Sequence, residues 1–74
     1  MFERIKELIV EEVGVEAEKV TMEASFKDDL NIDSLDLFEM VMTLEEEFDV
    51  EIPSEELEGM DTVADIVNYI ESHQ

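Results

Sequence analysis

The sequence contains no cysteine, and basic residues are almost as scarce. Without cysteine the chain has no disulfide framework, no thiolate nucleophile and no cysteine-ligated zinc site. Against 23 aspartates and glutamates stand four lysines and arginines, which are Arg4, Lys6, Lys19 and Lys27. Nucleic-acid binding needs basic groups to neutralise phosphates and is excluded, and an anionic membrane surface is disfavoured for the same reason. Partners with basic surfaces are therefore expected.

Long apolar runs and a secretion signal are also missing. No run approaches the ~18 residues of a membrane span, so we expect no membrane insertion. The N-terminus opens directly into a helical pattern without a signal-peptide core, which predicts a cytoplasmic protein. The net charge is −19, yet 45% of the residues are hydrophobic, which indicates a folded domain with an acidic surface. With 74 residues we expect one domain over 1–74.

The apolar periodicity predicts an all-α fold, a small four-helix bundle of three main helices and one short helix. The expected helices cover residues 2–13, 34–48, 54–57 and 62–71. Gly14 and Gly59 supply helix stops, while Asp33 and Ser54 are expected N-caps. Thr62 and Asp65 resemble a capping box at the start of the last helix. No window alternates as a strand would.

A connection of about 20 residues, 14–33, separates the first two helices, and such a length is unusual unless it serves a function. We expect it to be ordered, because it carries apolar side chains that can reach the core: Val15, Val20, Phe26, Leu30 and Ile32. Ser25 and Asp28 are expected to cap one helical turn within it.

The second helix has two apolar faces when residues are placed at about 100° intervals. One face is a core stripe made of Leu37, Met40, Val41, Leu44 and Phe48. The other carries Leu35, Phe38 and Met42 between acidic flanks, as expected of a docking surface for a partner with an apolar groove and a basic rim. Leu35 and Met42 fit this hypothesis better than Phe38, for which a core position is an equal alternative.

Ser34 stands at the start of that helix between Asp33 and Asp36. On propensity alone it is simply a good residue for a helix N-terminus. As a nucleophile it lacks a base, because the single histidine is His73 near the chain end, so a self-contained serine hydrolase is rejected. A modifying enzyme could reach the hydroxyl, and a phosphate ester on it would lie at the positive end of the helix dipole.

Residues 26–53 resemble the acyl carrier proteins of bacterial fatty-acid synthesis. The matching residues are Phe26, Asp29-Leu30, Asp33-Ser34-Leu35-Asp36, Glu39, Met42, Leu44-Glu45-Glu46, Phe48 and Ile52-Pro53, with Thr62-Val63 and Tyr69-Ile70 in the last helix. The resemblance implies that Ser34 carries a 4′-phosphopantetheine arm through a phosphodiester, and that the arm's thiol holds an acyl chain as a thioester. It also implies a carrier rather than an enzyme, with the acyl chain sheltered between the helices.

The resemblance further implies a face read by partner enzymes, which we call the docking face: Asp33, Leu35, Asp36, Glu39, Met42, Glu45 and Glu46. The implied partners are a phosphopantetheinyl transferase and fatty-acid synthesis enzymes with basic docking patches, and the carrier is expected to be a monomer.

Three positions depart from the family pattern. Asn31 replaces a glycine and is one of the few other residues that tolerate a left-handed backbone. Leu37 and Phe38 replace smaller or more polar residues and bear on the choice of partner and cargo.

Three alternatives remain beside a fatty-acid carrier. A carrier of polyketide or aminoacyl intermediates would share the serine arm. Asp29, Asn31 and Asp33 begin like an EF-hand loop, but Ser34 and Met40 stand where the loop needs glycine and glutamate, so no specific metal site is expected. Loose divalent binding by clustered carboxylates is still expected. An acidic decoy of nucleic acid is permitted by charge alone and would have no use for Ser34.

Overall fold

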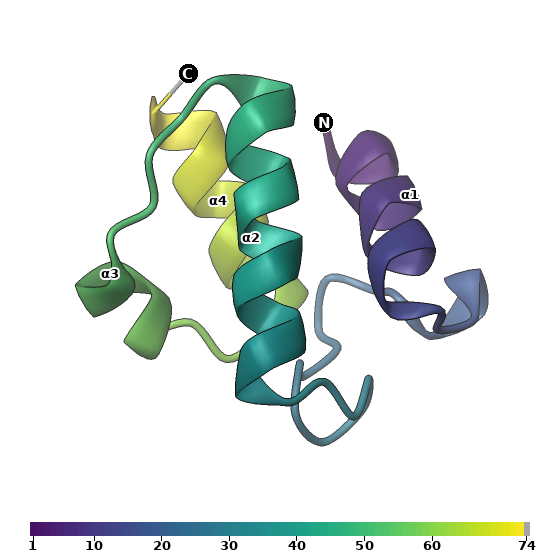
Figure 1. Ribbon diagram of the computed structural model, residues 1–74. Helices are drawn as coiled ribbons and strands as arrows, with labels where there is room; N and C mark the ends of the chain where they lie inside the picture. The colour runs from purple at the N-terminus through teal and green to yellow at the C-terminus, as the bar shows by residue number, and fades with distance from the viewer. Residues whose placement is uncertain (74) are drawn as a thin grey trace.

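The computed structural model describes residues 1–73, and within them the chain is all-α, as predicted. The elements are α1 (Phe2–Val13), a 3₁₀ helix η1 (Ala17–Lys19), α2 (Ser34–Phe48), α3 (Ser54–Glu58) and α4 (Val63–His73). Helix α2 runs antiparallel to α1 and parallel to α4, and α3 lies beside the first half of α2 (Figure 1). None of these helices has the length and apolar character needed to cross a membrane.

Most helix ends follow the predicted capping residues. Gly14 ends α1 in the left-handed conformation with φ 80°, a region that glycine enters without steric cost. The Thr62–Asp65 capping box is confirmed: Asp65 Oδ2 accepts from the amides of Asp61 (2.9 Å) and Thr62 (3.2 Å), and Asp65 N donates to Thr62 Oγ1 (3.4 Å). These bonds satisfy backbone donors that the helix itself cannot satisfy.

Ser54 was wrongly predicted as an N-cap, and three helix ends differ by one or two residues from the expected ranges 54–57 and 62–71: α3 ends at Glu58, and α4 spans Val63–His73. Ser54 is the first residue of α3 rather than its N-cap; the extended Pro53 occupies the cap, and its carbonyl accepts from Leu57 N at 3.0 Å. Proline fits there because a helix start leaves its N–H groups without intrahelical partners anyway. Helix α4 continues beyond Glu71 to His73, whose Nδ1 lies 2.8 Å from the Tyr69 carbonyl oxygen and whose ring stacks on the Tyr69 ring.

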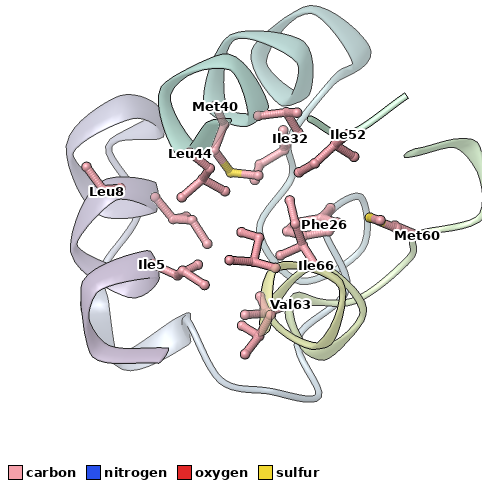
Figure 2. Packing of buried hydrophobic residues seen from close by; sticks show 14 of the residues in the cluster. Ile5, Leu8, Phe26, Ile32, Met40, Leu44, Ile52, Met60, Val63 and Ile66 are labelled. Atoms are coloured by element: carbon pink, nitrogen blue, oxygen red, sulfur yellow. The ribbon is translucent and has the colours of Figure 1, made fainter. Parts of the chain in front are cut away.

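The core is wholly apolar, and among residues 1–73 no polar or charged residue is buried. Figure 2 shows side chains from α1, the long connection, α2 and α4 converging on one cluster. Burying such side chains supplies most of the favourable free energy of folding. The buried residues are Ile5, Leu8, Ile9, Val20, Ala24, Phe26, Leu30, Ile32, Met40, Val41, Leu44, Val50, Ile52, Leu57, Met60, Val63, Ile66, Val67 and Ile70.

The connection 14–33 contains η1 and is tied to the segment that begins α4. Phe26 N donates to Asp61 O (2.9 Å), and Val63 N donates to Ala24 O (3.0 Å), around an isolated β-bridge between Ser25 and Thr62. The expected bond from Asp28 N to Ser25 Oγ is present at 3.2 Å, although residues 26–29 form a turn rather than a helix. Because these bonds satisfy the backbone, the connection can pack against the core without helical structure.

Polar side chains on the surface connect α1 to α2. Arg4 contacts Glu47 through Nε (2.9 Å) and Nη2 (3.2 Å) and also pairs with Glu7, and Thr43 Oγ1 donates to Glu12 Oε1. The hydrogen bond from Arg4 lowers the pKa of Glu47 below its usual range. Since Arg4, Glu7 and Glu47 are solvent-exposed, these ion pairs add little to the stability of the fold.

The capping box gives a pH-dependent prediction. Backbone N–H donors hold the pKa of Asp65 below its ordinary value, so the folded state favours the ionised carboxylate. The resulting stabilisation is present above the unfolded pKa and is lost as the pH falls through the folded pKa. Asp65→Asn should therefore lower the free energy of unfolding by ~1 kcal/mol at neutral pH, and the difference from the unsubstituted chain should vanish in acid.

Urea unfolding measured across the acidic pH range would check this prediction. Glu23→Gln removes the same charge from an exposed loop residue and should not reproduce the effect. A deficit in Asp65→Asn that stayed constant from neutral pH to strong acid would contradict the assignment.

Candidate functional site

Ser34 is the first residue of α2, and its side chain is exposed. The helix starts there because Asp33 is extended and its Oδ1 accepts from Asp36 N at 2.9 Å, while Leu37 N donates to the Asp33 carbonyl (3.0 Å). No residue of the described chain forms a hydrogen bond with the Ser34 hydroxyl. The hydroxyl is therefore accessible and free to react with an external group.

The backbone before the serine turns sharply at Asn31, whose φ is 54°. This confirms that asparagine adopts the left-handed conformation at the position where the family pattern has glycine. The turn places Ile32 in the core, where Ile32 N donates to Phe26 O at 2.8 Å, and leaves Asp33 and Ser34 outside. The location of the serine thus depends on the anchored connection as well as on α2.

The second apolar stripe of α2 lies on the surface. Leu35, Met42 and Phe38 are 68%, 60% and 49% exposed, whereas the core stripe is buried at Met40, Val41 and Leu44 and half-buried at Leu37 and Phe48. The exposure of Phe38 decides between the two interpretations of that residue: it is not a core residue. Asp33, Asp36, Glu39 and Glu46 are also exposed, so an apolar stripe with an acidic rim follows the serine along α2.

Glu45 differs from the other acids predicted for the docking face, because it is half-buried. Its Oε2 accepts from the backbone of Ile52 at 2.7 Å, and Ile52 is buried in the segment between α2 and α3. A charged acceptor on a partly buried amide makes a strong hydrogen bond. Glu45 therefore has a structural role that sequence reasoning missed, since the spacing of the two residues gives no sign of this contact.

A cavity of about 270 Å³ lies beside Ser34 between α2 and α3. Its apolar wall consists of Leu37, Phe38, Leu57 and Met60, and Ser34 and Ser54 also line it. We call it the α2–α3 cavity. Leu57 and Met60 come from a distant part of the chain, so the sequence could not link them to the serine. Two of the wall residues, Leu37 and Phe38, are positions that depart from the family pattern.

These features fit a phosphodiester-linked arm at Ser34. The hydroxyl is exposed and unengaged, and the first amides of α2 have no intrahelical acceptors, so they favour an anion at the helix N-terminus. Asp33 and Asp36 oppose that anion. The adjoining cavity has an apolar wall that fits an acyl chain attached to such an arm, and its lining also includes Lys27, Glu58 and Asp61.

Comparison with known proteins agrees with this geometry. Residues 3–70 match a family model described as a phosphopantetheine attachment site, which defines the chain as a carrier domain. The chain is 51% identical to an acyl carrier protein of Clostridium acetobutylicum over 73 residues, which cover 99% of this chain and 95% of the relative. A solved acyl carrier protein from Enterococcus faecalis superposes with a TM-score of 0.82 at 38% identity, covering 99% and 92% of the two chains.

The chain belongs to the acyl carrier protein family. Its cofactor is phosphopantetheine, and it is a carrier rather than a catalyst. The resemblance to acyl carrier proteins that the motif around Ser34 indicated is thereby confirmed. The assignment of individual residues to attachment and docking stays a prediction.

The contact of Glu45 predicts a stability effect. Glu45→Ala leaves the partly buried Ile52 amide without its acceptor and should cost about 1–2 kcal/mol, which lowers the melting temperature by roughly 4–15 °C in a domain of this size. Glu46→Ala is the matched control, because Glu46 is exposed and should change stability little. Equal melting temperatures for the two variants would show that the Glu45–Ile52 bond does not stabilise the fold.

Proposed function

We propose that Ser34 is the attachment residue of the 4′-phosphopantetheine arm and that the chain carries growing acyl chains in fatty-acid biosynthesis. The observation that carries the proposal is the exposed, unengaged Ser34 hydroxyl at the start of α2, beside the apolar α2–α3 cavity. Among the hydroxyl residues of the chain, this serine alone stands in the Asp-Ser-Leu-Asp motif that resembles the family's attachment site.

Attachment requires a phosphopantetheinyl transferase and coenzyme A. Ser34 Oγ forms a bond to the phosphorus that bears the pantetheine, the pyrophosphate P–O bond breaks, and adenosine 3′,5′-bisphosphate leaves. The hydroxyl proton passes to a base of the transferase. When attached, the arm supplies a thiol that holds the acyl group as a thioester.

The residues of this chain then bind and shelter the cargo. Leu37, Phe38, Leu57 and Met60 present apolar surface to an acyl chain that enters the α2–α3 cavity from Ser34. The gain is about 0.8 kcal/mol for each methylene removed from water. Because α3 is only five residues long, its wall residue Leu57 can shift with little loss of helical hydrogen bonding. Met60 lies in the segment that follows α3. The cavity can therefore adjust to chains of different length.

The proposed docking face serves the partner enzymes. Exposed carboxylates at Asp33, Asp36, Glu39 and Glu46 attract basic surfaces from a distance, and Leu35 and Met42 supply adaptable apolar contact. We propose that the partners are the transferase and fatty-acid synthesis enzymes with basic docking patches. We also propose that the carrier is a monomer, since a self-association that covered α2 would hide Ser34. The proposed location is the cytoplasm.

The choice of fatty-acid synthesis over polyketide or aminoacyl carriage rests on two sequence features. These are Leu44-Glu45-Glu46 followed by Phe48 at the end of α2, and Ile52-Pro53 before α3. The two features meet in one contact of the structure. Glu45 accepts a hydrogen bond from the backbone of Ile52, just before α3 begins at one side of the cavity.

Loading of the serine tests the attachment proposal. With coenzyme A and a phosphopantetheinyl transferase, the chain should gain the mass of one phosphopantetheinyl group, detected by intact mass spectrometry. Ser34→Ala should gain none. Ser54→Ala is the matched control, because Ser54 is also the first residue of a helix and lines the same cavity, and it should load like the unsubstituted chain. Loading of Ser34→Ala would end the proposal.

The docking face predicts an effect on association rate. Glu39→Lys and Glu46→Lys should slow association with the transferase about tenfold at low ionic strength, and the deficit should shrink in high salt because exposed charges are screened. Glu71→Lys places the same charge change on α4, away from the docking face, and should have a smaller effect. Stopped-flow binding measures these rates; an equal loss in all three variants would exclude a localised docking face.

A further inference from the structure

Loading of Ser34 would place a phosphodiester anion in an acidic region. The site already holds Asp33 and Asp36, and Glu58 and Asp61 line the adjoining cavity. In a chain with a net charge of −19, another negative charge adds to the repulsion. The amides at the start of α2 offset part of it. A nearby cation would offset more, and only four lysines and arginines are available.

Lys27 is the cation that the fold brings to Ser34. It lines the α2–α3 cavity together with Ser34, and it also lines a neighbouring cavity formed by the 25–28 turn, Leu37, Met60 and Asp61. The backbone on each side of it is held: Phe26 N donates to Asp61 O (2.9 Å), and Asp28 N donates to Ser25 Oγ (3.2 Å). The side chain therefore starts from a fixed point at the edge of the cavity.

The other three lysines and arginines are not among the residues that line the α2–α3 cavity. Arg4 is engaged by Glu47 and Glu7 on the α1 side of the molecule. Lys19, in η1, lines two other cavities that Ser34 does not line, and one of them also contains Asp36. Lys6 lies on α1. In contrast to Arg4, Lys27 forms no ion pair with any residue of the described chain, so its ammonium group is available.

We propose that Lys27 is a positioning residue for the cofactor: its ammonium pairs with the phosphodiester on Ser34 and orients the first part of the arm toward the α2–α3 cavity. The inference rests on the attachment proposed above. Lys27 is exposed and lines the cavity, and a lysine can lay its apolar stem along such a surface while its charged end stays in water. Lys27 thus relieves the repulsion from Asp33 and Asp36 and favours one direction of the flexible arm.

The test compares loaded and unloaded protein in four chains: the unsubstituted chain, Lys27→Met, Lys27→Arg and the control Lys19→Met. Methionine keeps an apolar stem and removes the charge. Intact mass first establishes loading in each chain, and thermal unfolding is then followed at low salt and at about 1 M salt. Phosphorus NMR of the loaded chains reports the environment of the phosphodiester directly.

At low salt we compare the melting temperature of the loaded protein minus that of the unloaded protein. This difference should be about 1–4 °C lower in Lys27→Met than in the unsubstituted chain. The gap between the two chains should disappear in high salt, and Lys27→Arg should behave like the unsubstituted chain. Lys19→Met should show no such coupling between substitution and loading. The phosphorus resonance should shift in Lys27→Met and not in Lys19→Met.

The outcomes separate this inference from the attachment proposal. If all chains load but Lys27→Met and Lys19→Met respond equally, or the phosphorus resonance is the same in both, Lys27 does not position the arm, and the attachment at Ser34 stands. If no chain loads, both proposals are overturned. If Lys27→Met were poorly folded by circular dichroism, Lys27→Gln would replace it in the same comparison.

Discussion

The site depends on the pairing between the long connection and the segment that begins α4. Phe26 N to Asp61 O and Val63 N to Ala24 O join parts of the chain that are far apart in sequence. They allow five connection residues, Val20, Ala24, Phe26, Leu30 and Ile32, to enter the core, where α1 contributes three. Because the connection is held in this way, the left-handed turn at Asn31 places Ser34 at a defined position on the surface.

The cost of burying a charge explains both the acidic surface of the chain and its apolar core. An unpaired buried carboxylate is costly, so the acids occupy the surface and the interior is built from apolar side chains alone. The α2 helix meets this constraint with two apolar faces, one in the core and one exposed at Leu35, Phe38 and Met42. An apolar stripe that stays exposed amid so many carboxylates gives no benefit to folding, which is why we propose that it serves recognition.

The acidic residues around the site have different roles despite their similar appearance in the sequence. Asp33 caps α2, and Glu45 holds the Ile52 amide, whereas Glu39 and Glu46 extend from the same helix into solvent. Glu45 thereby connects the proposed docking face to the wall of the α2–α3 cavity, since Ile52 leads into α3 and Leu57. Stability therefore shares residues with the recognition and the cargo shelter that we propose for this chain.

The sequence by itself determined the main helices, the core stripe of α2, the capping box at Thr62 and Asp65, and the family motif around Ser34. These features are local: they follow from helical periodicity, from caps within one turn, and from a contiguous motif. Only the tertiary structure decided that Phe38 is exposed, that Glu45 binds Ile52, and that Lys27, Leu57 and Met60 share a cavity with Ser34. The physical reason is that these contacts join residues on different elements, and their distances depend on how the helices and the anchored connection pack.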